Sequence, residues 1–260
     1  GDDLIVAVGE NNFIYGGAQN DMAFVFGKGN MSFMGGGDDF LFSVDETNTL
    51  NGGGGNNVLI GIGIQNLYSM GDGDDFIFNI GYANTYAVGG GKDTILNEGS
   101  KNHLDLEKGY DLLVSGEPSQ DNEINGGKGR DRFYLGGDAN KYTGGEDANT
   151  FIVTTAVKKD KTIYVKDQKT SDVIRLWHDA AAKNGAEKRE ALDMRNIWVS
   201  KGGNGDDLMM EVNLRNKEGA ANSDHRGTGT VSYKDWFKSS SAQSNFVFVG
   251  NRLDPDASTP

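Results

Sequence analysis

The stretch Gly71-Asp72-Gly73-Asp74-Asp75-Phe76-Ile77-Phe78 decides the fold, because the first half of the chain repeats its pattern at a fixed spacing. Together with Met70 it forms one nine-residue unit of the form G-G-x-G-x-D-x-U-x, in which U is apolar. Counted in steps of nine from Asp75, the sixth place of the unit holds Asp or Asn from Asp3 to Asp111 without insertion or deletion.

Asp and Asn alternate at the sixth place, so the true repeat is eighteen residues long and has two unlike halves. Asn57 and Asn149 are the exceptions, since they stand where Asp is expected. A two-residue insertion near Pro118 shifts the series, and Asn122 then takes the sixth place, with Gln120 as the in-phase alternative. Such a repeat predicts a solenoid in which each coil adds one short strand to each of two parallel sheets. About eight coils at roughly 4.8 Å give a rod of about 40 Å.

The sequence therefore predicts an all-β protein in which residues 1–152 form a parallel β-roll of eighteen-residue coils. The repeats end near residue 153, and residues 153–250 are expected to form a mixed, mostly β segment that caps the open end of the roll. Within this segment we expect strands at 162–165, 173–176, 207–214, 230–233 and 245–249 and one short helix within 180–194. Residues 251–260 are expected to be a flexible tail.

The eighth place of each unit is apolar, with Ser32 as the exception, and is expected to point into the core. Because strand side chains alternate, the seventh and ninth places point outward. On the sheet that follows the Asp turns the ninth place is also apolar, as at Phe24, Phe42, Ile60 and Phe78. Three interpretations stay open: another segment or domain covers this outer face, a partner or second copy binds it, or the inward and outward faces are reversed.

The repeating Gly and Asp places predict a series of calcium sites along one edge of the roll. Glycines permit backbone conformations that turn carbonyl oxygens toward a common point, and each Asp adds a carboxylate. Oxygen ligands without imidazole or thiolate favour Ca²⁺ over zinc or copper. The candidate ligands are Asp3, Asp21, Asp39, Asn57, Asp75, Asp93, Asp111 and Asp131, with Gly16, Gly17, Gly35, Gly37, Gly53, Gly55, Gly71, Gly73, Gly89, Gly91, Gly109, Gly127 and Gly129.

Each ion is expected between consecutive Asp-type turns, one coil apart. Without metal, a column of carboxylates roughly 5 Å apart would repel, so we expect the roll to be largely unfolded until calcium binds. The turns of Asn57 and Asn149 lack the carboxylate at the sixth place and should bind calcium more weakly.

The other half of each coil lacks the paired glycines and carries a neutral side chain at the sixth place. Asn adopts left-handed backbone conformations and forms hydrogen bonds with the backbone and with an identical neighbour in a stack. We therefore expect a metal-free asparagine ladder on the opposite edge, with plain turn preference as the alternative. Its members are Asn12, Asn30, Asn48, Asn66, Asn84, Asn102, Asn122 and Asn140.

Composition narrows the classes of function. A net charge of −13 disfavours nucleic acid and anionic membranes as direct partners, and the absence of cysteine excludes disulfide and thiolate chemistry. No apolar run approaches the length of a membrane span. Gly1 stands at the fourth place of a unit, so we expect the chain to be a piece of a longer protein.

No arrangement of residues predicts catalysis. His103, His178 and His225 are scattered, no serine lies in a nucleophile-elbow context, and the glycine turns lack the Lys-Ser/Thr of a phosphate loop. Trp177, Trp198 and Trp236 are expected in the core of the cap, with sugar stacking as the alternative. We expect the chain not to be an enzyme.

Units such as Gly89-Gly90-Gly91-Lys92-Asp93 and Gly126-Gly127-Lys128-Gly129-Arg130-Asp131 resemble the repeats of the RTX (repeats-in-toxin) family. The alternation with x-x-G-x-x-N units is most similar to the C-terminal repeats of the multifunctional-autoprocessing RTX toxins of Gram-negative bacteria. Downstream, Thr230-Val231-Ser232-Tyr233-Lys234-Asp235-Trp236-Phe237 is similar to the segment that follows many RTX rolls. The stretch 200–209 resembles a solitary repeat, for which a hairpin turn is the alternative.

This resemblance implies type I secretion, an unfolded state in the calcium-poor cell interior and calcium-triggered folding outside, where the module supports the virulence of its parent toxin at the host cell surface. The alternative is an adhesive module that recognises a host glycan, protein or membrane. A third hypothesis, an appendage of a secreted lipase or protease, requires a catalytic domain outside this sequence. The chain departs from the family in that no terminal secretion signal is recognisable after Gly250.

Overall fold

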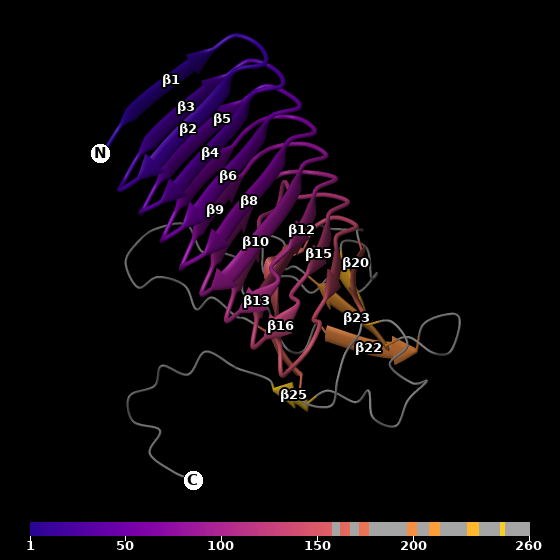
Figure 1. Ribbon diagram of the computed structural model, residues 1–260. Helices are drawn as coiled ribbons and strands as arrows, with labels where there is room; N and C mark the ends of the chain where they lie inside the picture. The colour runs from indigo at the N-terminus through magenta and orange to yellow at the C-terminus, as the bar shows by residue number, and fades with distance from the viewer. Residues whose placement is uncertain are drawn as a thin grey trace, which may run out of the picture.

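The computed structural model describes residues 1–157, 162–166, 172–176, 197–201, 208–213, 228–233 and 245–247. Its elements are all β-strands in two sheets, and the eighteen-residue coils stack along one axis from β1 at the N-terminus (Figure 1), which confirms the predicted parallel β-roll. No helix occurs among these residues, hence none that is long and apolar enough to cross a membrane. The helix expected within 180–194 and the tail 251–260 lie outside the described residues.

From β1 to β12, successive strands of the chain alternate between the two sheets. The first sheet has the order β1 (Leu4–Val8), β3 (Met22–Phe26), β5 (Phe40–Val44), β7 (Val58–Gly61), β9 (Phe76–Asn79), β11 (Thr94–Asn97), β14 (Leu112–Ser115), β17 (Arg132–Gly137), β19 (Thr150–Val157), β21 (Val173–Leu176) and β25 (Asn245–Val247). The second has the order β2 (Phe13–Ala18), β4 (Met31–Gly36), β6 (Thr49–Gly54), β8 (Leu67–Asp72), β10 (Thr85–Gly91), β12 (His103–Asp105), β15 (Glu123–Asn125), β18 (Lys141–Thr143), β20 (Thr162–Lys166), β24 (Thr228–Tyr233), β23 (Leu208–Asn213) and β22 (Ile197–Lys201). In addition, β13 (Lys108–Gly109) pairs with β10, and β16 (Lys128–Gly129) pairs with β13.

The register follows the repeat. Leu4 pairs with Met22, and Phe40 pairs with Val58, one eighteen-residue coil apart. The insertion near Pro118 lengthens one coil, so that Leu112 pairs with Arg132. Parallel pairing continues beyond residue 152, where Thr150 of β19 pairs with Val173 of β21. The division of the chain at residue 152 stays a prediction, because the two sheets themselves run through it.

The expected C-terminal strands correspond to β20, β21, β23, β24 and β25, and β22 is an addition. β22 pairs antiparallel with β23, and β23 pairs antiparallel with β24, while β24 and β25 pair parallel with coils of the roll. The strands on either side of residues 202–207 therefore form a hairpin, as the alternative interpretation of the stretch 200–209 expects. Residues 202–207 themselves lie outside the described part.

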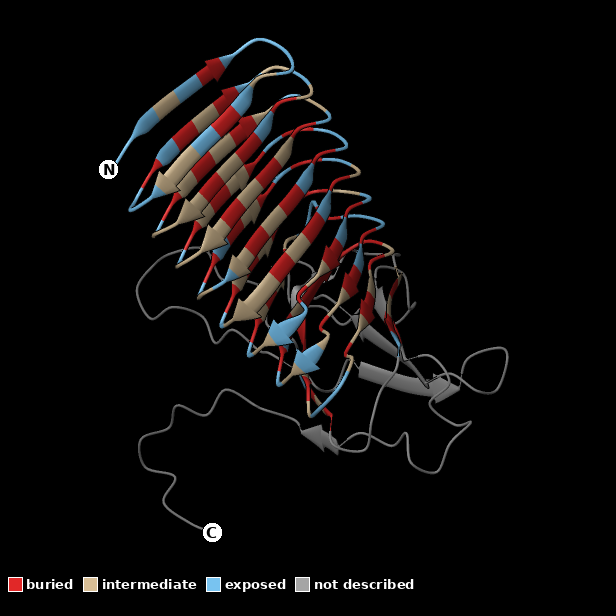
Figure 2. Ribbon diagram, in the orientation of Figure 1, coloured by how far each residue is buried: buried red, intermediate tan, exposed pale blue. Residues whose placement is uncertain are grey.

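Buried residues alternate with half-buried or exposed residues along the strands of the roll (Figure 2). The eighth place is buried from Ile14 to Phe151, as predicted, whereas Ile5 in the first coil is only half-buried. A second inward place, two residues further on, is also buried and was not expected from the repeat. It holds Met34, Met70 and Val88 below the second sheet, and Val25, Ser43, Asn79, Asn97 and Ser115 below the first.

The second inward place brings polar side chains into the core. Asn79 Oδ1 accepts hydrogen bonds from the hydroxyl of Tyr86 at 2.8 Å and from the backbone N–H of Gly81, and its Nδ2 donates to Asn97 Oδ1 at 2.8 Å. The phenol ring of Tyr68 stacks on that of Tyr86, with 4.8 Å between ring centroids. Burial raises the pKa of Tyr68 to about 12, so both phenols remain neutral. Polar stacking thus continues inside the roll as well as along its edges.

The outer face of the first sheet is apolar, as expected. Phe24, Phe42, Ile60 and Phe78 are half-buried on this face, and the rings of Phe24 and Phe42 lie 6.0 Å apart. Because the eighth place is buried and the ninth is not, the inward and outward faces are not reversed. The aromatic side chains cover one another from coil to coil and leave part of each ring accessible.

Candidate metal centre

The sixth-place side chains of the Asp-type units form one column along an edge of the roll, which we call the Asp edge. Each one directly precedes a strand of the first sheet, as Asp21 precedes β3 and Asp75 precedes β9. The eighteen-residue register stacks them, and all but Asp3 are buried. The column contains Asp3, Asp21, Asp39, Asn57, Asp75, Asp93, Asp111, Asp131 and Asn149.

One oxygen of each side chain on the Asp edge belongs to a continuous ladder. The backbone N–H of Asp21 donates to Oδ1 of Asp39 at 2.7 Å, and that of Asp75 donates to Oδ1 of Asp93 at 2.8 Å. The same bond recurs across the lengthened coil, from Asp111 N to Asp131 Oδ1 at 3.0 Å. The ladder ends on Asp172, whose Oδ1 accepts the N–H of Asn149 at 2.9 Å.

Asp172 was missed because it follows Asn149 by twenty-three residues, outside the nine-residue spacing. Its position immediately before the strand of Val173 is the signal that could have found it, since every member of the column stands before a first-sheet strand.

The second carboxylate oxygen has no partner at six of these aspartates. Oδ2 of Asp21, Asp39, Asp75, Asp93, Asp111 and Asp131 is buried and receives no hydrogen bond. Buried polar atoms are nearly always paired, and an unpaired buried charge is costly. The column therefore requires protons or cations at these atoms.

Several of these carboxylates have raised pKa values. Burial, together with the neighbouring charges of Asp93 and Asp131, raises the pKa of Asp111 to about 8. Burial also raises the pKa of Asp75 to about 7 and those of Asp93 and Asp131 to about 6. At neutral pH several of these groups are thus poised between a bound proton and an unpaired buried charge.

Backbone carbonyl oxygens lie beside the unpaired carboxylate oxygens. A Cβ placed on Gly16 would lie 2.5 Å from Oδ2 of Asp21 and 2.9 Å from the carbonyl oxygen of Met34. One carboxylate oxygen and one carbonyl oxygen of the next coil thus share a small space. Among the described residues no three His, Cys, Asp or Glu side chains converge, so a metal on this edge would combine single carboxylates with backbone oxygens. Ca²⁺ accepts such a set of hard oxygen ligands.

The glycines of these turns are required by stacking as well as by conformation. Gly35, Gly53, Gly71 and Gly89 have φ between 94° and 114°, and a Cβ on each of them would lie 1.7–2.0 Å from the carbonyl oxygen of the glycine one coil before. Gly37, Gly55, Gly73, Gly91 and Gly129 form a parallel column of the same kind. Gly16 and Gly109 do not share the positive φ, whereas Gln19 and Glu107 adopt it at glycine places. The remaining predicted glycines, Gly17 and Gly127, adopt it as well.

We expect Gly71→Ala to destabilise the calcium-loaded protein by at least about 2 kcal/mol, because φ is +99° and the new Cβ would lie 1.8 Å from the carbonyl oxygen of Gly53. Gly54→Ala is the matched control, since nothing lies within 4 Å of a Cβ there and φ is not positive. Thermal unfolding in excess calcium measures both variants. Equal melting temperatures would contradict the stacked arrangement.

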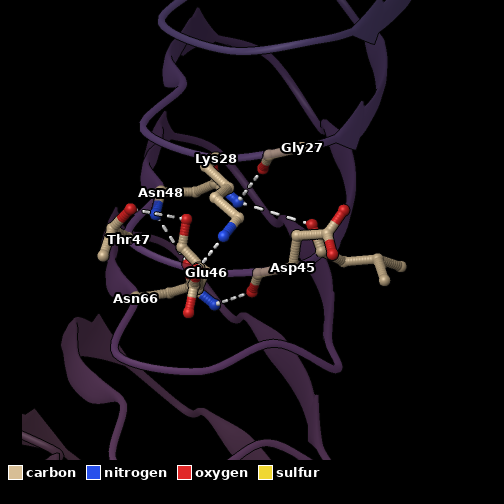
Figure 3. A network of polar contacts seen from close by, with 8 residues as sticks. Gly27, Lys28, Asp45, Glu46, Thr47, Asn48 and Asn66 are labelled. Carbon is tan, nitrogen blue, oxygen red and sulfur yellow. Dashed lines mark hydrogen bonds and ion pairs between the residues drawn. The ribbon is translucent and has the colours of Figure 1, made fainter.

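On the opposite edge, Asn side chains form a ladder in which both ends of the amide are used. Asn48 Oδ1 accepts the N–H of Asn30 at 2.8 Å, and its Nδ2 donates to the carbonyl of Gly27 at 2.8 Å. Figure 3 shows the same bond from Asn66 Nδ2 to the carbonyl of Asp45, at 3.0 Å, beside the ion pair of Lys28 and Glu46. The Oδ1 ladder contains Asn12, Asn30, Asn48, Asn66, Asn84, Asn102, Asn122 and Asn140. Asn122 rather than Gln120 occupies it, and Gln120 is exposed.

The amide nitrogen explains why the two edges differ. On the Asn edge, Nδ2 supplies hydrogens to backbone carbonyls, for example from Asn84 to Gly63 and from Asn102 to Gly81, both at 3.0 Å. At the aspartates of the Asp edge the corresponding atom is an oxygen, which cannot donate as an amide nitrogen does. The Asn edge is therefore internally satisfied, and the Asp edge is not.

A third column, at the fifth place of the Asp-type units, was not expected. Oδ1 of Asn20 accepts the N–H of Asp38 at 2.8 Å, and Oδ1 of Asp38 accepts that of Asn56 at 2.7 Å. The bonds continue from Asp74 to Asn56 and from Lys92 to Asp74. These side chains are exposed and bind the next coil, whereas sixth-place side chains bind the preceding one. The sequence signal that could have revealed this column is the recurrence of Asn or Asp at the fifth place every eighteen residues.

The structure describes few of the histidines and tryptophans that the sequence analysis considered. His103 lies 3.9 Å from Glu123 on the outer surface of the second sheet, and both side chains are exposed. His178, His225, Trp177 and Trp236 lie outside the described residues, as does the environment of the Trp198 side chain.

Comparison with known protein families adds the identity of the metal. A model of the RTX calcium-binding nonapeptide repeat, in four copies, matches residues 1–24, 35–61 and 119–151. No curated protein matches the chain. The matched segments include Asp21, Asp39 and Asp131 of the Asp edge. The matched segments of the roll are therefore an RTX repeat region, and the nonapeptide repeats of that family bind calcium.

Proposed function

We propose that this chain is a calcium-binding module of a bacterial toxin exported by type I secretion, and that calcium triggers its folding outside the cell. The observation that carries the proposal is the column of buried Oδ2 atoms without partners on the Asp edge. The resemblance of the sequence repeats to those of multifunctional-autoprocessing RTX toxins supports a toxin as the parent protein. The module has no enzymatic activity of its own in this proposal and presents its parent at the host cell surface.

The calcium ions are proposed to lie along the Asp edge. Asp21, Asp39, Asp75, Asp93, Asp111 and Asp131 would supply their Oδ2 atoms, and the turns would supply backbone carbonyls. Asp3 and Asn57 are the remaining predicted side-chain ligands, one exposed and one an amide. Bound Ca²⁺ supplies the positive charge that the buried carboxylates lack. Since an ordered column exists only in the folded roll, binding free energy becomes folding free energy.

This coupling suits export. Extracellular calcium modules are tuned to Kd values of about 10⁻⁴–10⁻³ M, so such sites stay empty at the low calcium concentration inside a cell. The buried carboxylates then disfavour the folded roll, and an unfolded chain can pass through a secretion channel. Outside the cell, calcium neutralises the column and the coils close on one another.

Calcium titration of the metal-stripped protein at neutral pH, followed by far-UV circular dichroism, tests the proposal. We expect a cooperative gain of β-signal, because each ion neutralises carboxylates that two coils share. Asp93→Ala should reduce the number of bound ions, since it removes one unpaired Oδ2. Asn84→Ala is the matched control on the other edge and should lower stability while the ion count stays the same. A wild-type protein that is fully folded in chelator at neutral pH would contradict calcium-triggered folding.

An adhesive module is the second candidate function. The half-buried aromatic residues Phe24, Phe42 and Phe78 on the outer face of the first sheet favour it, since exposed apolar faces mark interaction sites. A host protein, glycan or membrane is the proposed partner. Binding of the calcium-loaded chain to host cells, lost in Phe42→Ser, would support adhesion, and absence of binding would leave the export module alone.

A further inference from the structure

Asn57 keeps the ladder of the Asp edge intact. Its Oδ1 accepts the N–H of Asp39 at 3.0 Å, and its own N–H donates to Oδ1 of Asp75 at 2.6 Å. The side chain is 1% exposed, like the aspartates above and below it. Replacement of the carboxylate by an amide has therefore not displaced the turn.

The second atom of the Asn57 amide must be nitrogen. Since the N–H of Asp39 donates to one atom, that atom is the oxygen, and the hydrogen-bond network thereby assigns the other as Nδ2. Nδ2 donates to the carbonyl of Gly55 at 3.1 Å and to that of Met70 at 3.5 Å. Both carbonyls belong to the Asp edge, one in the same turn and one in the next coil.

The aspartate turns hold an oxygen in the same space. Gly16 and Gly52 occupy equivalent places two coils apart, and so do Met34 and Met70. A Cβ on Gly52 would lie 3.0 Å from Asn57 Nδ2 and 3.1 Å from the carbonyl oxygen of Met70. On Gly16 it would lie 2.5 Å from Asp21 Oδ2 and 2.9 Å from the carbonyl oxygen of Met34. The spaces beside Gly52 and Gly16 therefore have the same shape. The first holds the two amide hydrogens of Asn57, whereas the second holds a carboxylate oxygen without hydrogens.

A cation therefore gains little at Asn57. It would meet amide hydrogens instead of a carboxylate oxygen, and it would displace two existing hydrogen bonds. The backbone carbonyls beside Asn57 already accept hydrogen bonds from its amide nitrogen. Carbonyls on the Asn edge are paired in the same way, for example that of Gly63 with Asn84 Nδ2. Two coils also separate Asp39 from Asp75, about 10 Å, which weakens the repulsion between them.

We propose that Asn57 divides the calcium ladder into two series, Asp3 to Asp39 and Asp75 to Asp131, which load independently because the amide of Asn57 takes the place of an ion. This inference rests on the proposed function and goes beyond weak binding at one turn. It makes Asn57 a residue that determines how many ions the roll takes and which of them cooperate.

Counting ions in Asn57→Asp tests the proposal. Native mass spectrometry of the calcium-saturated full chain should show at least one more ion in the variant than in the wild type, because the carboxylate restores the missing ligand. Asp75→Asn makes the reverse change and should lose at least one ion. Asn84→Asp is the matched control on the opposite edge and should gain none. An unchanged count in Asn57→Asp, or a variant that does not fold in excess calcium, would overturn the proposal.

Calcium titrations followed by circular dichroism test the independence of the two series. As a single substitution, Asp93→Asn should shift only part of the calcium titration curve to higher calcium concentration. Combined with Asn57→Asp, it should shift the whole curve. A shift of the whole curve in the wild type would contradict two independent series. A wild-type protein that binds no calcium would instead overturn the proposed function itself, so the two failures are distinguishable.

Discussion

In the presence of a chelator, the roll should gain β-structure as the pH falls from about 8 to about 5, without any calcium. The buried aspartates bind protons more tightly in the folded roll than in the unfolded chain, because burial raises the pKa of Asp111 to about 8 and that of Asp75 to about 7. A native state that binds more protons loses stability as the pH rises. The loss begins above the ordinary aspartate value of 3.8 and is complete only above the pKa of Asp111.

The expected effect is large. Each unit of pKa shift corresponds to about 1.4 kcal/mol, so ionisation of buried aspartates such as Asp75 and Asp111 costs on the order of several kcal/mol. The whole stability of a typical domain is about 5–15 kcal/mol. Ionisation of the Asp edge can therefore unfold the metal-free roll by itself.

Far-UV circular dichroism in chelator at low protein concentration measures this pH dependence. The calcium-saturated protein is the control and should keep its β-signal at pH values near 8, where the ions replace the protons. A metal-free protein that becomes more stable as the pH rises from about 5 to about 8 would show that the carboxylates are not buried in the folded state.

Asp111→Asn should have opposite effects with and without calcium. In chelator at a pH near 8, the variant should be more stable than the wild type by several kcal/mol, because it removes the carboxylate with the highest pKa in the column. Its new Nδ2 can donate to backbone carbonyls, as that of Asn57 does. In excess calcium it should be less stable than the wild type, because one unpaired Oδ2 that would bind an ion is gone.

The fraction of folded protein in chelator at a pH near 8, from far-UV circular dichroism, measures the first effect, and denaturant unfolding in calcium measures the second. Asp105→Asn is the matched control, since Asp105 lies half-buried on β12 away from the Asp edge, and it should change neither condition appreciably. Destabilisation of Asp111→Asn in both conditions would mean that the carboxylate serves the ladder alone. Stabilisation in both would mean that no ion binds beside it.

The eighteen-residue repeat was sufficient to predict the register of the roll. Leu4 pairs with Met22 and Phe76 with Thr94 because each coil closes after the same number of residues, and the insertion near Pro118 lengthens one coil without breaking either ladder. The sequence also predicted that one edge is charged and the other neutral, since Asp and Asn alternate at the sixth place of the repeat. Both are local properties that each coil carries in its own residues.

Three features escaped the sequence analysis because they depend on neighbours in space. Asp172 continues the Asp edge although its spacing departs from the repeat, since it stands immediately before β21, which pairs with β19, and its Oδ1 accepts the N–H of Asn149. Asn79 and Ser43 are polar yet buried, because the second inward place is set by how the coil closes. The fifth-place column of Asn20, Asp38 and Asn56 forms bonds with the next coil that no single unit reveals.

The sequence by itself determined the coil length, the two parallel sheets, most of the positions of the left-handed glycines and the edge on which the carboxylates stand. Only the tertiary structure decided which atom of each sixth-place side chain is satisfied. Oδ1 is bound by the preceding coil at Asp75 and at Asn57 alike, whereas the second atom is an unpaired oxygen at Asp75 and a hydrogen-bond donor at Asn57. The physical reason is that a repeat specifies register one coil at a time, while the need for a cation arises from the oxygens that two stacked coils bring together.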